Sequence, residues 1–101
     1  MTEPLNLSIE ALSASHAGAL ISAVEKATLN SIGKVVDIKH ISEDAIRFSI
    51  QITADKLDQL SYALLNCNLS LKHGAEDVLQ NVANQYSLYR DVNLNLLVGF
   101  F

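Results

Sequence analysis

The pattern that most constrains this chain is an alternation of apolar and polar side chains in residues 46–52. Large apolar residues occupy every second position, and polar residues fill the positions between them. The apolar set is Ile46, Phe48, Ile50 and Ile52, and the polar set is Arg47, Ser49 and Gln51. Successive side chains of a β-strand point to opposite faces of its sheet. The segment is therefore predicted to be a strand with one buried face and one polar face.

Other segments repeat this alternation or carry the three-and-four spacing of a buried helix stripe. Further strands are predicted over 5–11, 34–41, 68–72 and 92–100. Helices are predicted over 17–30, 54–65 and 75–89. Ser15 and Thr53 are expected to be the N-caps of the first two helices, because hydroxyl oxygens accept from the free N–H groups of a first turn. Gly33 is expected to close the first helix in the left-handed conformation.

The order of these elements predicts the fold class. Up to Lys72 the order is β-α-β-β-α-β, the split arrangement called ferredoxin-like, in which two helices cover one face of an antiparallel sheet. The first and third strands are then the central pair. No linker or low-complexity tract precedes the last helix and strand. We predict one α+β domain over residues 1–101, with a two-layer sandwich core at 5–72 and a C-terminal helix-strand extension at 75–101.

Composition excludes several classes of protein. Hydrophobic residues make up 50% of the 101 residues and charged residues 18%, which argues against disorder and favours hidden apolar surface. The net charge of -4 disfavours nucleic acid and anionic membranes as partners. No apolar run approaches the ~20 residues of a membrane-spanning helix. The start of the chain lacks a signal-peptide pattern and Cys67 is the single cysteine, so we expect a cytoplasmic location.

The predicted polar sheet face also argues against binding of single-stranded RNA. Sheets of this topology that bind RNA carry stacking aromatic residues on their two central strands. The corresponding positions here are Ser8, Glu10, Ser49 and Gln51. We therefore interpret this face as solvated or packed against a partner.

Nothing in the sequence requires catalysis, and we predict no catalytic residue, no metal and no cofactor. His73, Glu76 and Asp77 form the nearest approach to a metal-ligand spacing, but they are explained as polar residues in a helix first turn. Cys67 has no histidine near it in the sequence and is interpreted as a small buried residue. The acidic pairs 43–44 and 55/58 are assigned to a hairpin tip and a helix first turn. The four glycines are too scattered to form a phosphate loop.

The junction between the first strand and the first helix carries more information. It reads Ser15-His16-Ala17-Gly18-Ala19-Leu20, so Gly18 lies in a helix first turn whose N–H groups attract a carboxylate. The alternative is a plain capped helix with one glycine tolerated for packing.

Together with the element order over residues 5–72, this turn resembles the ACT-domain family of regulatory modules in amino-acid metabolism. Gly18 and Leu20 match the family turn, whereas Ser15 and Ala17 stand where an acidic residue and a proline are usual. The resemblance implies an effector site at the interface between paired domains. Carried over by position, the contacts are Ser15, His16, Ala17 and Gly18 from the turn, with Lys34, Val35 and Val36 across from them.

Two functions follow from these observations. The first is a small regulatory domain that self-associates, with a dimer favoured, and binds an amino-acid-like metabolite at the turn. The second is a structural or protein-interaction module without a ligand, which associates with itself or another protein. It rests on the apolar end of the chain, where both faces of the last strand are hydrophobic. The predicted interface residues are Leu96, Leu97, Val98, Phe100 and Phe101. An enzyme ranks third and would require Cys67 or a histidine to be essential.

Overall fold

The computed structural model describes residues 4–14, 16–67, 69–72, 74–85 and 90–100. Its strands are β1 (Leu5–Ser13), β2 (Lys34–Ser42), β3 (Ala45–Thr53), β4 (Leu69–Leu71) and β5 (Asp91–Phe100). Its helices are α1 (Ala17–Asn30), α2 (Leu57–Leu65) and α3 (Ala75–Gln85), and a 3₁₀ turn at Ala54–Lys56 precedes α2. The predicted order of strands and helices is therefore found. The last predicted helix extended to residue 89, and residues 86–89 lie outside the described part.

The described residues form an α+β fold with a five-stranded mixed sheet, so the predicted class is confirmed at this level. The strand order is β2-β3-β5-β1-β4, which corrects the expectation that β1 and β3 are central neighbours in an antiparallel sheet. β5 lies between them, parallel to β1 and antiparallel to β3. The last strand is thus the middle of the sheet, and both of its backbone edges are paired along nearly its whole length.

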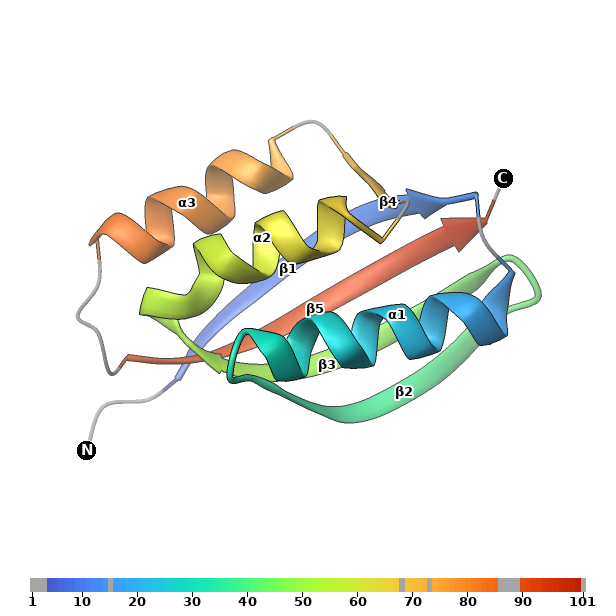
Figure 1. Ribbon diagram of the computed structural model, residues 1–101, viewed down its shortest axis with the longest axis horizontal. Coiled ribbons are helices and arrows are strands. Elements are labelled where there is room, and N and C mark those ends of the chain that lie inside the picture. The colour runs from blue at the N-terminus through green and yellow to red at the C-terminus, as the bar shows by residue number, and fades with distance from the viewer. Residues whose placement is uncertain (1–3, 15, 68, 73, 86–89, 101) are drawn as a thin grey trace.

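All three helices lie over the same face of the sheet (Figure 1). α1 packs beside α2 and along β2, and α2 packs beside α3. The core fills the space between the helices and the alternate strand residues that face them. Its largest fully buried side chains include Phe48, Ile46 and Ile50 of β3, Leu94 and Leu96 of β5, and Leu20, Leu57, Leu60, Leu64 and Leu79 of the helices. The alternation in residues 46–52 therefore separates the covered face from the open face as predicted.

Three local details differ from the sequence predictions. His16 is the N-cap of α1, and its Nδ1 accepts a hydrogen bond from the Ala19 N–H at 3.4 Å; Ser15 lies outside the described residues. Thr53 precedes the 3₁₀ turn and makes no side-chain cap hydrogen bond. At the end of α1 the left-handed residue is Ile32, with φ 59°, and not Gly33.

Gly33 is needed there for space. A Cβ at this position would lie 3.2 Å from the backbone oxygen of Gln51 and 3.1 Å from a methyl carbon of Thr28. The glycine thus allows the start of β2 to approach β3 closely.

Candidate functional site

The turn that begins α1 is largely exposed. Gly18 is exposed, and a Cβ at this position would meet only the His16 ring, at 3.7 Å and beyond. Ala17 is half-buried against the core, so it anchors the turn. The first-turn N–H groups carry the positive end of the dipole of a 14-residue helix. This end of α1 is thus suited to an anionic group such as a carboxylate.

The second half of the predicted site lies at the other end of α1. Lys34, Val35 and Val36 begin β2, directly after the residues that close the helix (Figure 1). The 14 residues of α1 span about 21 Å at 1.5 Å per residue, so one chain does not bring the two halves together. Lys34 is exposed, Val35 packs partly against the core, and 44% of Val36 is exposed.

β2 itself is an edge strand. It pairs with β3 on one side and has no neighbouring strand on the other within the described chain. Bulges between Val35 and Asp37 and between His40 and Ser42 interrupt its pairing. A shallow groove of about 300 Å³ runs beside it, lined by Glu25 of α1 and residues 35–38. The edge therefore offers both unpaired backbone groups and a groove where the second half of the predicted site lies.

Most of the predicted C-terminal interface belongs to the core of the chain. Leu96 and Val98 are fully buried under the helices, so neither is available to a partner. Phe100 packs partly against the same core, and Leu97 is half-buried on the open face of the sheet. Phe101 lies outside the described residues. The apolar run at the end of the chain is explained by the central position of β5, which corrects its assignment to an external surface.

The open face of the sheet carries a row of aligned side chains across four strands. Glu10, Leu97, Arg47 and Lys39 are register partners from β1 to β2. Glu10 pairs with Lys72 at 3.1 Å. At the other end of the row, Arg47 and Lys39 are direct neighbours of like charge, an unfavourable arrangement on a sheet face. Within the described residues neither has an ion-pair partner, and the buried Nε of Arg47 has no acceptor.

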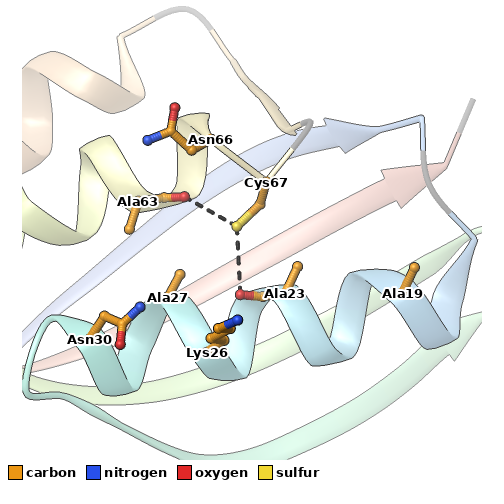
Figure 2. Close-up of a pocket in the computed structure, with 8 residues that line it drawn as sticks. All are labelled: Ala19, Ala23, Lys26, Ala27, Asn30, Ala63, Asn66 and Cys67. Carbon is orange, nitrogen blue, oxygen red and sulfur yellow. Dashed lines mark hydrogen bonds between the residues drawn. The ribbon is translucent and has the colours of Figure 1, made fainter.

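A second groove, which the sequence reasoning missed, lies between α1 and α2 (Figure 2). It has a volume of about 420 Å³ and is lined mainly by small residues together with polar groups at its rim. The lining residues are Ala19, Ala23, Lys26, Ala27, Asn30, Ala63, Asn66 and Cys67. The sequence signal for this groove is the spacing of the alanines at positions 19, 23 and 27. Residues four apart lie on the same face of a helix, so this face of α1 carries only small side chains.

Cys67 forms part of the wall of this groove. Its Sγ lies 3.1 Å from the Ala63 carbonyl oxygen of α2 and 3.5 Å from the Ala23 carbonyl oxygen of α1, so its single S–H has an acceptor within reach on each helix (Figure 2). Desolvation by burial raises the pKa of this thiol above its ordinary value. Because the thiolate is the reactive form, the environment of Cys67 lowers its reactivity.

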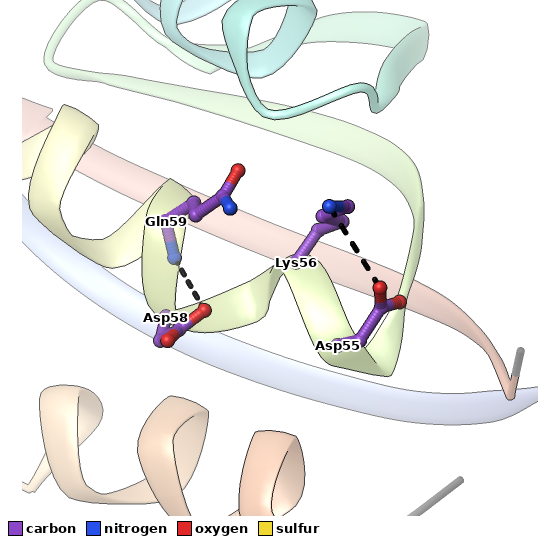
Figure 3. Close-up of polar contacts among 4 residues, drawn as sticks. All are labelled: Asp55, Lys56, Asp58 and Gln59. Carbon is purple, nitrogen blue, oxygen red and sulfur yellow. Dashed lines mark hydrogen bonds and ion pairs between the residues drawn. The ribbon is translucent and has the colours of Figure 1, made fainter. Parts of the chain in front are cut away.

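The acidic residues at the start of α2 have local structural contacts (Figure 3). Asp58 Oδ1 accepts from the Gln59 N–H at 2.8 Å, and Asp55 Oδ2 lies 3.9 Å from the Lys56 ammonium. Both carboxylates lie where a helix N-terminus favours negative charge. Over the part of the chain that the structure describes, no group of three or more His, Cys, Asp or Glu side chains converges as a metal site would require.

Comparison with known proteins does not assign the chain to a family. No helix in the described residues is long and apolar enough to cross a membrane. The chain matches no protein-family model, no curated protein and no solved structure.

Proposed function

We propose that this chain is a small regulatory domain that binds an amino-acid-like metabolite at a site shared between two copies. The observation that carries the proposal is the direction of the edge strand β2 relative to α1. α1 begins at the end of the sheet where β2 finishes, and it ends where β2 starts (Figure 1). An antiparallel second copy at the β2 edge would therefore bring its residues 34–36 toward the first copy's residues 16–18.

The chemistry of the shared site suits a zwitterion. The ligand carboxylate is bound by the N–H groups of Ala17 and Gly18, since that of Ala19 donates to His16 Nδ1, and Lys34 of the second copy adds a positive charge. Glu43 and Asp44 supply negative charge for the ligand ammonium from the β2–β3 turn. The backbone oxygen of Asp44 accepts from the Phe100 N–H at 2.9 Å, and Phe100 is the register partner of Ser13 at the end of β1. This turn is thus at the end of the sheet where α1 begins.

The fold gives further support. The order β-α-β-β-α-β is retained through β4, and β5 is inserted between β1 and β3 without changing their relative direction. We take this insertion as support for a relation to the ferredoxin-like arrangement of the regulatory domains that the chain resembles.

A ligand screen tests the proposal. The full chain is heated with each of the twenty amino acids at 5 mM, about 100 times a Kd of 50 μM, which predicts about 2.7 kcal/mol of stabilisation for a binder. We expect at least one amino acid to raise the melting temperature by about 10 °C or more. Lys34→Ala is expected to reduce this shift, while Lys26→Ala, an exposed lysine at the α1–α2 groove, keeps it. A flat response to all twenty amino acids would refute the sensing function.

A further inference from the structure

We infer that the second copy pairs with β2 about a two-fold axis through Ile38, so that Asp37 of each copy lies opposite Lys39 of the other. This inference rests on the pairing of copies in the proposed function, and it adds the register and the residues that select the partner. It starts from the like charges of Lys39 and Arg47 on the open sheet face, which have no ion-pair partner among the described residues.

The geometry of β2 limits the registers. Its two bulges leave residues 37–40 as the regular segment, in which Asp37 and Lys39 align with Ser49 and Arg47 on the open face. Ile38 aligns with Phe48, whose side chain is buried under the helices. Directly opposed residues of an antiparallel pair project to the same face. A two-fold axis must therefore pass through a residue, and the central choices are Asp37, Ile38 and Lys39.

Electrostatics selects among these axes. An axis through Asp37 would set two carboxylates against each other, and an axis through Lys39 would set two ammonium groups against each other beside Arg47. An axis through Ile38 gives two Asp37–Lys39 pairs by symmetry and an Ile38–Ile38 contact on the helix side. Opposite charges in direct cross-strand positions are favourable, and like charges are not. The sequence Asp37-Ile38-Lys39 is thus complementary to itself in antiparallel pairing.

This register also accounts for the arrangement within one chain. The row Arg47–Lys39 continues across the edge into Asp37 of the second copy, so the two neighbouring cations gain an acidic neighbour. Val36, 44% exposed at a bulge, comes to lie opposite His40 of the second copy. Charge complementarity therefore identifies the occupant of the edge as a second copy of this chain.

Cysteine scanning measures the register directly. Single cysteines replace Asp37, Ile38 or Lys39 in a Cys67→Ser background, and each protein is oxidised and resolved on a non-reducing gel. Only opposed residues place two copies of the same side chain within disulfide distance across an antiparallel pair. We expect Ile38→Cys to give the dominant crosslinked dimer. Dominant crosslinking at position 37 or 39, or at none of the three, overturns the inference.

Charge variants provide a test that does not depend on a disulfide. Asp37→Lys is expected to weaken the dimer about tenfold in sedimentation equilibrium, since both symmetric pairs become repulsive. The double variant Asp37→Lys/Lys39→Asp restores the opposite charges and is expected to recover most of the affinity. Asp77→Lys, at an exposed position of α3 away from β2 (Figure 1), is the matched control for net charge. Failure of the double variant to recover the dimer overturns the proposed register.

The outcomes separate this inference from the proposed function. A dimer crosslinked at position 38 that responds to no amino acid supports the register and refutes sensing. A dimer that binds an amino acid but crosslinks at position 37 or 39 refutes the register and leaves the shared site in place. A protein that is monomeric up to the highest concentration tested refutes both.

Discussion

Replacing Ile32 with glycine is expected to stabilise the protein. Ile32 follows Ser31, the C-cap of α1, and adopts φ 59°, the left-handed conformation. Two hydrogen bonds fix it there: the Ile32 N–H donates to the Leu29 oxygen at 3.0 Å, and the Gly33 N–H donates to the Thr28 oxygen at 2.9 Å. This pattern is the Schellman motif, in which glycine usually takes the left-handed position. A β-branched residue is strained at this position.

The magnitude follows from three opposing effects. The left-handed conformation costs an L-residue about 1–2 kcal/mol, and the β-branched side chain places Ile32 near the upper value. Glycine gives back about 0.4–1 kcal/mol because it makes the unfolded chain more flexible. The Ile32 side chain is 74% exposed, so its removal sacrifices only a few tenths of a kcal/mol of apolar burial, about 0.5 at most. The expected net gain is about 0.5–1 kcal/mol.

Thermal and urea unfolding, followed by circular dichroism, measure this gain. For a domain of this size we expect the melting temperature to rise by about 2–6 °C, with no change in the urea m-value. Leu29→Gly is the matched control, because Leu29 is 69% exposed but lies inside α1, where glycine costs about 1 kcal/mol. If Ile32→Gly destabilises the protein as much as Leu29→Gly does, the assignment of strain to Ile32 is wrong.

Three further predictions concern the packing of the sheet and the titration of Cys67. Leu96→Ala should lower the free energy of unfolding, measured in urea, by about 3 kcal/mol because Leu96 is fully buried. Leu97→Ala on the open face should lower it much less. Equal losses would contradict the assignment of Leu96 to the covered face and of Leu97 to the open face. Gly33→Ala should lower the melting temperature, since the added Cβ would crowd Thr28 and Gln51, and an unchanged value would argue against that close approach. Burial raises the pKa of the Cys67 thiol above 9.0, its value in the unfolded chain. The neutral buried thiol therefore makes its full contribution to stability below pH 9.0, and this contribution is lost as the pH rises through the folded pKa. Between pH 8 and 10.5 the wild type should lose more stability than Cys67→Ser, and parallel curves would contradict the raised pKa.

The candidate site was predictable only in part. The turn at residues 16–18 was singled out because a glycine in a predicted helix first turn is visible in the sequence; the exposure of Gly18 comes from the structure. Its separation from Lys34 already follows from the helix predicted over 17–30, which is about 21 Å long. The sequence does not specify how a second copy would be placed to bring the two segments together. The α1–α2 groove also escaped prediction, because its walls are alanines whose spacing is ordinary for a packed helix.

Residue type also did not predict which residues take the cap and left-handed positions at the ends of α1. Ser15 and Gly33 were the natural choices by residue type, yet His16 caps α1 and Ile32 takes the left-handed position. Residue preferences at helix ends are worth about 1 kcal/mol. β2 can pack against β3 only because Gly33 has no side chain, and this packing outweighs the preference for glycine in the left-handed position.

What the sequence alone determined is the set of elements and the faces they bury. Alternation in β3 and the helical stripes specify which side chains face the core, because side-chain direction is a local property of strand and helix geometry. Strand order was decided only by the tertiary structure. The apolar residues 92, 94, 96 and 98 fit an edge interface or a central strand equally well by pattern. Pairing with both β1 and β3 places them in the centre, because only there are both backbone edges of β5 hydrogen-bonded and its apolar face covered by helices.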